Sequence, residues 1–369
     1  MIKAVFLTHP HSLRSAITGG VQLCSQEFYE VISKVPGMEL LEYHVPYTKN
    51  IRQRVRIKLG MENYSMYDVK KDAPALIKFI EENNISAVFI NMASLVKYAI
   101  PIKERFADKV KVVMLSHGNH SGDFLHLITK PIHQPNFIRK RMDKYRLGSL
   151  ISTEAQMRVS ELDAVITLSE TEKQIENWFG GKRVYFLPRR LYADFLDYKP
   201  VMGRVGFMGR LDHPPNYQGI SMVLEQLNGT KADIRIVGAP NEWGNKLQQQ
   251  FPFVKYLGEL SDAGLEEEVS TWSLLLNPVW WYSTGASTKL AKAISWGVPI
   301  ISTTAGNRGY QWSGGELLMS ESPAEMAAKI SEFAFDEAKI MEQHRIVQNI
   351  ANNGPSMEEL TKIISKSVQ

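Results

Sequence analysis

The stretch from Asn277 to Tyr310 constrains the fold of this chain more than any other part of the sequence. It follows an apolar run that predicts the end of a buried strand. Residues 283–287 are small and polar, and the pattern from Thr288 to Trp296 predicts a short helix. Gly297 ends that helix, because glycine readily adopts the positive φ of a C-terminal cap. Val298 to Ser302 then predicts a second buried strand.

The loop before this helix has the features of a diphosphate site. The first N–H groups of a helix lack helical partners, and together with the helix dipole they favour an anion. Lys289, one turn into the helix, adds a positive charge. The small residues Gly285, Ala286 and Ser287 allow a ligand to approach the backbone. An ordinary helix capped by Ser287 or Thr288 explains the same pattern, and the residues alone leave both interpretations open.

Apolar runs and helical patterns alternate twice along the 369 residues, which predicts an α/β protein of two domains. Such a length is comfortable for two domains. We expect a first domain at residues 1–195 and a second at residues 200–352. A linker rich in Tyr, Asp and Pro is expected at residues 192–200. The final helix, within residues 355–369, is expected to pack back on the first domain.

Composition favours a globular protein of a reducing compartment. A hydrophobic share of 44% and a charged share of 22% are typical of soluble globular proteins. Cys24 is the one cysteine, which excludes an intrachain disulfide, and we interpret it as a core residue. The residues after Met1 predict a strand rather than a signal peptide, and no apolar run reaches the roughly 18 residues of a transmembrane helix. We therefore expect a cytoplasmic location.

The net charge of +4 hides an asymmetry between the two halves. Residues 1–200 carry 29 Lys and Arg against 21 Asp and Glu, a net charge of +8, whereas the remainder carries −4. The basic excess gathers at residues 52–58 and 139–146, the second with a helical pattern and apolar neighbours. An anionic membrane, nucleic acid and plain solvent all fit such a surface. Our expectation is peripheral contact with the inner face of the plasma membrane and no nucleic-acid partner.

A second candidate site lies in the loop expected from Ser116 to Asp123, after a predicted strand at residues 110–115. The carboxyl ends of parallel strands form the edge at which open α/β sheets bind ligands. In such a loop His117, His120 and Asp123 can bind a sugar or move a proton. Their spacing also resembles that of metal ligands, but no further carboxylate supports a metal site. Structural hydrogen bonds are the alternative.

Six motifs in a fixed order resemble those of a known family. They are the Gly-Arg turn at residues 206–216, the corner at 257–260, the loop and helix at 283–299, the strand and glycine loop at 300–309, the pair Gly19-Gly20, and the strand leading into a helix at 163–170. The second half is similar to the nucleotide-sugar-binding domain of GT-B glycosyltransferases, most of all glycosyltransferase family 4. This resemblance implies two Rossmann-like parallel-sheet domains that face each other across a cleft.

Departures from the family pattern indicate a divergent branch. Family 4 usually carries two glutamates eight residues apart around this helix, where Thr284 and Lys292 stand here. The first glutamate normally contacts the donor sugar, so Thr284 puts the usual sugar contact in doubt. The lysine usual after the Gly-Arg turn is replaced near Gln218. The lysine of the family's helix is retained as Lys289.

The resemblance implies how the donor, most of all a UDP-sugar, is bound. Arg210, Lys289 and the N–H groups near Ser287 hold the diphosphate and stabilise the charge that grows as the sugar leaves. Glu259 accepts a hydrogen bond from the ribose or the base. The implied donor-binding residues are Gly19, Gly20, Gly209, Arg210, Gly238, Leu257, Gly258, Glu259, Thr284, Gly285, Ala286, Ser287, Thr288 and Lys289.

Acceptor binding is expected in the first domain, at His11, Asn119 and His120. The resemblance implies retention of the anomeric configuration, with the leaving phosphate helping to deprotonate the acceptor. Inversion stays open because of the missing glutamate and needs a base, for which His11, His117 or Asp123 are candidates. The residues expected to act in catalysis are His117, Asp123, Arg210 and Lys289. No bound metal or other cofactor is expected, since GT-B enzymes generally need none.

The expected activity is sugar transfer to a glycan or lipid-linked acceptor in the synthesis of cell-surface polysaccharide or lipopolysaccharide. One alternative is a GT-B epimerase, which acts on the nucleotide sugar alone and does not need a basic first domain. Another is a non-catalytic protein that binds nucleotide sugars or nucleic acid. The lost glutamates favour this last alternative, whereas the retained Arg210 and Lys289 oppose it.

Overall fold

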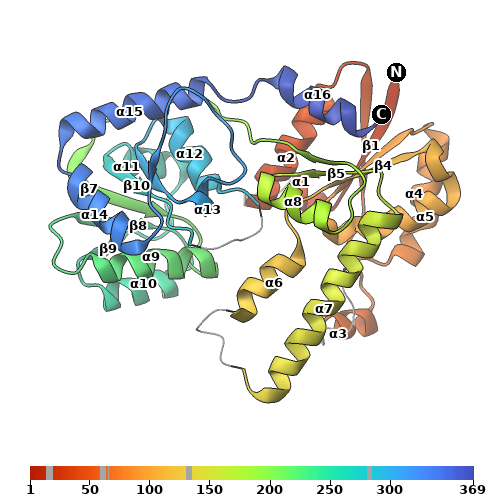
Figure 1. Cartoon of the computed structure of the whole chain (residues 1–369), viewed down its shortest axis with the longest axis horizontal. Helices are drawn as coiled ribbons and strands as arrows, with labels where there is room; N and C mark the ends of the chain where they lie inside the picture. The colour runs from red at the N-terminus through yellow and green to blue at the C-terminus, as the bar shows by residue number, and fades with distance from the viewer. Residues whose placement is uncertain (14–19, 59–63, 65, 130–134, 281–284) are drawn as a thin grey trace. The chain divides into compact units, whose positions relative to one another are not determined.

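The chain forms two compact units, each built around a parallel sheet (Figure 1). The structure, a computed structural model, describes residues 1–13, 20–58, 64, 66–129, 135–280 and 285–369. The first unit comprises Met1–Arg189, Ser283–Gly285 and Ser356–Gln369, and the second comprises Arg190–Tyr282 and Ala286–Pro355.

The described part of the first unit contains a sheet of six parallel strands in the order β2-β1-β3-β4-β5-β6. These strands are β1 (Ile2–Thr8), β2 (Met38–His44), β3 (Ala87–Asn91), β4 (Lys111–Leu115), β5 (Ala164–Thr167) and β6 (Val184–Phe186). The helices are α1 (Pro10–Leu13), α2 (Gly20–Ser33), α3 (Ile51–Lys58), α4 (Val69–Glu82), α5 (Ala99–Phe106), α6 (His120–Thr129), α7 (Phe137–Ser160), α8 (Glu170–Trp178) and α16 (Met357–Ser367), with 3-10 helices η1 (Ala93–Tyr98) and η2 (Ala107–Lys109).

Both faces of this sheet are covered, which explains why its strands are continuous apolar runs. Successive side chains of a strand point to opposite faces. In β1, Val5 and Leu7 therefore belong to one core, with side chains of α4 and α5, whereas Ala4 and Phe6 belong to the other, with side chains of α2 and α16. Cys24 lies buried in this second core, as predicted. The C-terminal helix α16 packs on α2.

The described part of the second unit contains a sheet of six parallel strands in the order β12-β11-β10-β7-β8-β9. They are β7 (Val201–Met208), β8 (Asp233–Val237), β9 (Val254–Tyr256), β10 (Trp272–Leu276), β11 (Ile300–Ser302) and β12 (Leu318–Met319). The helices are α9 (Pro214–Gln226), α10 (Asn241–Gln250), α11 (Asp262–Val269), α12 (Thr288–Trp296), α13 (Thr304–Asn307), α14 (Pro323–Phe333) and α15 (Glu337–Asn352).

The stretch expected to be a linker, residues 192–200, runs along the second unit instead. The N–H of Asp194 donates to the carbonyl of Ser295 at 3.0 Å, and the N–H of Lys199 donates to the carbonyl of Ser270 at 3.0 Å. Because backbone donors away from water need partners, these contacts hold the stretch against α12 and the end of α11.

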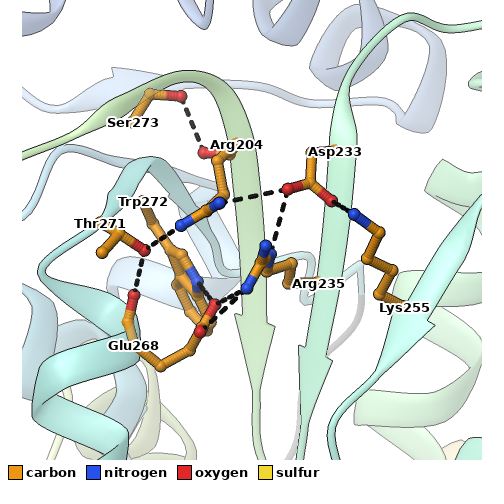
Figure 2. A network of polar contacts seen from close by, with 8 residues as sticks. All are labelled: Arg204, Asp233, Arg235, Lys255, Glu268, Thr271, Trp272 and Ser273. Carbon is orange, nitrogen blue, oxygen red and sulfur yellow. Dashed lines mark hydrogen bonds and ion pairs between the residues drawn. The ribbon is translucent and has the colours of Figure 1, made fainter.

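A network of polar contacts ties the amino ends of the second unit's strands to α11 (Figure 2). Asp233 of β8 accepts hydrogen bonds from Arg204 Nε at 3.2 Å and Arg235 Nε at 3.1 Å. Arg235 Nη1 also donates to Glu268 at 3.0 Å, and Glu268 accepts from Trp272 Nε1 at 2.8 Å. These charges lie near the starts of the strands, so they stabilise the framework at the end opposite the carboxyl ends.

The strand order predicts where each sheet would bind a ligand. In the second unit β8 lies on one side of β7 and β10 on the other, so the order reverses between β7 and β10. Open α/β sheets bind ligands outside the carboxyl ends of strands at such a reversal. The turn at Gly209 and the loop that begins at Asn277 border this place. In the first unit the reversal lies between β1 and β3, next to Thr8 and Asn91. Among the described residues, no helix is long and apolar enough to cross a bilayer.

Candidate functional site

Two glycines bring the carboxyl ends of β7 and β8 into direct contact. Gly209 follows β7 with φ of 148°, and Gly238 follows β8 with φ of 149°. A Cβ on Gly238 would lie 2.0 Å from the carbonyl oxygen of Gly209, so no larger residue fits there. The N–H of Gly238 donates to the carbonyl of Gly258 at 2.8 Å. Three of the predicted donor-binding glycines therefore lie together at the carboxyl edge of this sheet.

Lys289 of α12 reaches the same edge. Its Nζ donates to Asn216 Oδ1 at 2.7 Å, and Asn216 Nδ2 donates to the carbonyl of Arg210 at 2.8 Å. The Nζ lies 5.4 Å from the centre of the Phe207 ring, and a Cβ on Gly209 would lie 3.5 Å from this Nζ. One hydrogen bond and one aromatic face thus hold the ammonium beside the turn that follows β7.

The electrostatics of this corner favour an anion. Burial, together with the nearby charge of Arg308, lowers the pKa of Lys289 from 10.5 to about 8. Arg308 directly follows α13, on the second loop of the motif that ends at Gly309. Desolvation and a like charge both disfavour the protonated amine. A phosphate bound here would offset both effects, because it would supply an opposite charge.

Ser287 caps α12, as one of the two interpretations of the sequence predicted. Its Oγ accepts from the N–H of Leu290 at 3.4 Å and donates to Asn277 Oδ1 at 3.0 Å. The hydroxyl of Tyr310 donates to the carbonyl of Ser287 at 2.6 Å. These contacts position the start of α12 between the ends of β10 and β11. A capped helix still carries the positive end of its dipole, so the cap does not exclude an anion.

Arg210, expected to hold a diphosphate, pairs with Asp212 in this structure. Its Nε donates to Asp212 Oδ1 at 2.9 Å, while 69% of the arginine side chain is exposed. An ion pair between solvent-exposed groups contributes little to stability, so Arg210 can exchange Asp212 for phosphate oxygens at little cost. The hydrogen bonds and charge of Asp212 raise the pKa of Arg210, and the charge of Glu259 raises it further.

The corner predicted to hold the base follows β9 at this edge. Gly258 adopts φ of 75°, and the hydroxyl of Tyr256 donates to the carbonyl of Gly238 at 2.6 Å. Leu257 is half-buried against the core, whereas Glu259 is exposed. The carboxylate of Glu259 is therefore open to a hydroxyl or N–H donor from a ligand.

In the first unit, Asn91 organises a polar cluster at the carboxyl ends of β1 and β3. Its Nδ2 donates to Thr8 Oγ1 at 2.9 Å and to Ser25 Oγ at 2.9 Å, and its Oδ1 lies 2.8 Å from His117 Nε2. Because an amide oxygen only accepts, His117 carries its proton on Nε2 and presents Nδ1 as an acceptor. Burial and the charge of Arg189 lower the pKa of His117 to about 3.

This neutral state argues against the role of base expected for His117. A neutral imidazole offers no positive charge to a phosphate. A group with a pKa of about 3 is also too weak a base to deprotonate an acceptor hydroxyl near neutral pH. The role that the geometry leaves is acceptance of a hydrogen bond at Nδ1, for example from a sugar hydroxyl.

His120 and Asp123 lie in the first turn of α6, which corrects the prediction of a loop that continues to Asp123. The buried carboxylate of Glu154, from α7, reaches the start of this helix. Its Oε1 accepts from the N–H of His120 at 2.9 Å and of Ser121 at 3.2 Å, and the hydroxyl of Tyr64 also donates to it. Since the N-terminal donors of α6 bind an internal carboxylate, this helix start is unsuited to a phosphate.

The predicted residues His120 and Asn119 differ in the contacts that their side chains make at the start of α6. His120 stacks on Tyr64 with ring centres 4.6 Å apart, and burial lowers the pKa of His120. Asn119 is buried, and its Oδ1 accepts from the N–H of Gly122 at 3.0 Å. In the described part of the chain, Asn119 Nδ2 has no hydrogen-bond partner. His120 thus stabilises the helix start, while Asn119 Nδ2 is a buried donor without a partner among the described residues.

His11 lies in α1 within an aromatic cluster beside the ends of β1 and β2. The rings of His9 and His11 are 5.2 Å apart, His9 stacks on Tyr47 at 3.9 Å, and Tyr47 lies 5.3 Å from Tyr67. His11 and Tyr47 are exposed, whereas His9 is buried. The cluster presents flat aromatic faces with polar edges to solvent, a surface that suits a sugar ring.

The remaining predicted residues have these positions. Gly19 and Thr284 lie outside the described residues. Gly20 is exposed and begins α2. Gly285, which belongs to the first unit, donates its N–H to Glu172 Oε1 at 3.2 Å. The backbone donor of Gly285 that was expected to face a diphosphate therefore contacts a carboxylate in this structure.

Sequence reasoning missed three residues that shape these sites. Asn216 lies in the predicted Gly-Arg turn, but its contact with Lys289 depends on α12 folding back over β7. Asn91 carried a detectable signal, because a polar residue that ends a buried apolar strand needs partners. The position of Arg308 near Lys289 had no local signal, since eighteen intervening residues separate them along the chain.

Comparison with protein families finds a match within the second unit. Residues 203–336 match the model of the glycosyl transferases group 1 family. This range runs from β7 to just past α14 and includes Gly209, Gly238, Lys289 and Arg308. A search of curated protein sequences finds no match.

Several solved structures share the fold of the whole described chain. HepE of Anabaena, in complex with UDP and glucose, has 15% sequence identity and a TM-score of 0.63 over 99% of this chain and 99% of its own. Sucrose-phosphate synthase of Thermosynechococcus elongatus has 13% identity and a TM-score of 0.69 over 99% and 98%. The lipopolysaccharide outer core galactosyltransferase WaaB, in its apo form, has 13% identity and a TM-score of 0.62 over 100% and 99%. These likenesses confirm the predicted GT-B fold, and the family match confirms the predicted glycosyltransferase class.

Proposed function

We propose that this chain, in which residues 203–336 form a glycosyl transferases group 1 domain, moves a sugar from a UDP-sugar to a glycan or lipid-linked acceptor. The proposed setting is the synthesis of cell-surface polysaccharide or lipopolysaccharide at the cytoplasmic side of the plasma membrane. HepE was solved with UDP and glucose, and WaaB is a lipopolysaccharide galactosyltransferase, which supports this choice of donor and acceptor class. Contact with the membrane itself is argued separately below.

The observation that carries the proposal is the ammonium of Lys289, held beside two apposed glycines where the strand order reverses. In the proposed complex Lys289, Arg308 and the start of α12 face the diphosphate. Arg210 leaves Asp212 to join them. Charge on the leaving diphosphate increases as the sugar departs, so fixed positive groups stabilise the transition state more than the ground state.

The proposed reaction retains the configuration at the anomeric carbon. The bond between this carbon and the diphosphate oxygen breaks, and the acceptor oxygen bonds to the same face. The acceptor's proton passes to the leaving phosphate oxygen, so no protein base is needed. The pKa of about 3 for His117 supports this route, because it removes the best-placed histidine from the candidate bases. His117 Nδ1 is instead proposed to accept a hydrogen bond from a sugar hydroxyl.

The acceptor is proposed to contact the exposed rings of the aromatic cluster, those of His11 and Tyr47. Both groups belong to the first unit and lie after carboxyl ends of its strands. A Tyr47→Ala variant tests this assignment. It should raise the KM for the acceptor and leave the binding of UDP unchanged, whereas a parallel loss of UDP binding contradicts an acceptor role.

The first test of the function is thermal stabilisation by UDP, GDP, ADP and CMP. A ligand present at about 100 times its dissociation constant should stabilise the protein by about 2.7 kcal/mol. We expect this shift with UDP and not with the other three. A shift with GDP or ADP alone changes the donor class, and no shift with any nucleotide contradicts the donor site.

The second test is turnover with UDP-sugars, with and without lipid-linked and oligosaccharide acceptors. We expect UDP release and a new glycosidic bond only when the acceptor is present, and NMR of the product should show the anomeric configuration of the donor. Conversion of the UDP-sugar without an acceptor indicates an epimerase. Inverted product contradicts the proposed route of the proton.

A further inference from the structure

The first half of α7 exposes apolar side chains on the side that faces away from the protein. Ile138, Met142 and Tyr145 are 69%, 50% and 73% exposed. They lie at positions i, i+4 and i+7, which places them on one stripe of the helix. The buried residues of α7 include Asp143 and Leu150 and lie on the opposite stripe. In Figure 1 these first turns of α7, drawn in yellow, extend beyond the sheet of the first unit.

Single exposed apolar residues are common on proteins, but a stripe of them is not. Phe137, one residue before Ile138 and about 100° round the helix from it, is also exposed, at 77%. Asn136 caps the helix, because its side chain accepts a hydrogen bond from the N–H of Arg139. The helix therefore has its own N-terminal cap directly before the apolar stripe. One side of α7 thus packs on its own unit, whereas the apolar side chains on the other side are exposed in the described part of the chain.

Positive charge borders the stripe. Residues 137–150 contain five Lys or Arg and one acidic residue, Asp143. Asp143 is buried and pairs with Arg139 at 3.0 Å. Lys140, Arg141 and Lys144 are exposed. At about 100° per residue, Arg141 lies next to the stripe, whereas Lys144 and Lys140 lie further round the helix. An exposed apolar stripe with a cationic border matches the interface of an anionic bilayer, where the apolar groups enter below the headgroups and the cations meet lipid phosphates.

The helix α3 repeats the combination in the same unit. Ile51 and Val55, four residues apart, are 75% and 49% exposed. Arg52, Arg54 and Arg56 are exposed on the same short helix. The two basic stretches seen in the sequence thus both combine arginines with outward apolar groups, which a surface adapted only to solvent does not require.

We infer that α7, through Ile138, Met142 and Tyr145 with Lys140, Arg141 and Lys144, docks this chain on an anionic lipid bilayer. A second copy of the chain is a poorer occupant, because it brings the same positive charge to the contact. Nucleic acid satisfies the cations but leaves the apolar stripe against a hydrated phosphate backbone. The inference does not depend on sugar transfer, and UDP binding in the second unit reports on the donor site independently.

Flotation of the full-length protein with vesicles tests the inference. We expect binding to phosphatidylcholine vesicles that contain phosphatidylglycerol and much weaker binding to phosphatidylcholine alone. Each cation near a membrane surface changes partitioning about fivefold, so K140Q/R141Q/K144Q should weaken binding about 100-fold. I138S/M142S/Y145S should weaken it by more than about tenfold although the charge is unchanged.

Trp178→Ser serves as the matched control. Trp178 is 72% exposed and lies on α8 of the same unit, so its loss should leave vesicle binding unchanged. Every variant should keep the wild-type melting temperature and the wild-type shift with UDP, which separates a docking defect from misfolding or a damaged donor site. Equal binding of the wild type to both kinds of vesicle, or unchanged binding of both triple variants, overturns the inference.

A labelling experiment distinguishes lipid from the other occupants. Cys24 is the one cysteine of the chain and is buried, so Met142→Cys provides a single exposed thiol for an environment-sensitive fluorophore. The fluorophore should move into an apolar environment on addition of anionic vesicles, whereas one at Ser160→Cys, exposed at the other end of α7, should not. A change that depends only on protein concentration identifies self-association, and a change on addition of DNA but not vesicles identifies nucleic acid. Either result overturns lipid docking.

Discussion

Replacing Lys289 by methionine should weaken UDP binding about 10- to 150-fold while the free protein stays almost as stable as the wild type. Methionine keeps an unbranched apolar stem over Phe207 and removes the ammonium. The loss leaves Asn216 Oδ1 without its donor, which costs about 1–3 kcal/mol. The substitution also removes the free-energy penalty of holding a charged lysine at this buried position. The difference between a pKa of 10.5 and about 8 corresponds to about 3 kcal/mol. The two effects oppose each other, so we expect the free energy of unfolding at pH 7 within about 2 kcal/mol of the wild type.

The sign of the pH dependence follows from the lowered pKa. Below pH 8, Lys289 is charged in both the folded and the unfolded protein, and the full penalty acts on the folded state. Between pH 8 and 10.5 the folded protein loses this proton first, so the penalty disappears and the wild type gains stability relative to Lys289→Met. A diphosphate needs the charged amine. Its affinity for the wild type should therefore fall about tenfold between pH 7 and pH 9, because most of the lysine is neutral at pH 9.

Calorimetric titration with UDP at pH 7, 8 and 9, together with thermal unfolding, checks both statements. A charge-assisted hydrogen bond contributes about 1.5–3 kcal/mol, so Lys289→Met should bind UDP about 10- to 150-fold more weakly at pH 7 and without the fall toward pH 9. Lys292→Met, nearly one turn further along α12 and beside the Trp296 ring, is the control and should bind as the wild type does. Wild-type affinity in Lys289→Met refutes the donor site. A loss of 3–5 kcal/mol in its unfolding free energy, as for a broken buried ion pair, indicates a structural role instead.

Three further predictions concern the framework and the cofactor. In a urea titration, Gly238→Ala should lower the unfolding free energy by more than about 3 kcal/mol, since its Cβ would lie 2.0 Å from the Gly209 carbonyl oxygen. Gly229→Ala is the control: its φ is 80° but the space around it is open, so it should lower the unfolding free energy by about 1 kcal/mol. Arg158→Met should lower the unfolding free energy by about 3–5 kcal/mol, because it leaves Glu176 buried without the partner that lies 2.7 Å away. Adding Glu176→Leu to this variant should restore most of the lost stability. A single variant as stable as the wild type contradicts a buried charge pair. Incubation with a chelator should leave sugar transfer unchanged, and activity lost with the chelator and restored by manganese contradicts metal independence.

Local chemistry made some elements predictable. The helix at residues 288–296, its cap at Ser287 and its end at Gly297 agree with the structure, because a cap and a positive φ are set by neighbouring residues. The apolar strands were recognisable since both faces of each sheet are covered. The start of α6 was not, because Glu154 stabilises it from another helix more than thirty residues along the chain. No local pattern around His120 reports that contact.

The sequence by itself determined the class of this protein: parallel strands alternating with helices, the glycines after β7 and β8, and a lysine in the first turn of α12. These features act over a few residues, through backbone conformation and the period of apolar side chains. Only the tertiary structure decided what the charged groups do. Lys289 has a pKa of about 8 and His117 one of about 3 because segments distant in the chain bury them and bring Arg308 and Arg189 near them. Desolvation and charge depend on distance in space, and the order of residues along a chain does not contain that distance until the sheet has formed.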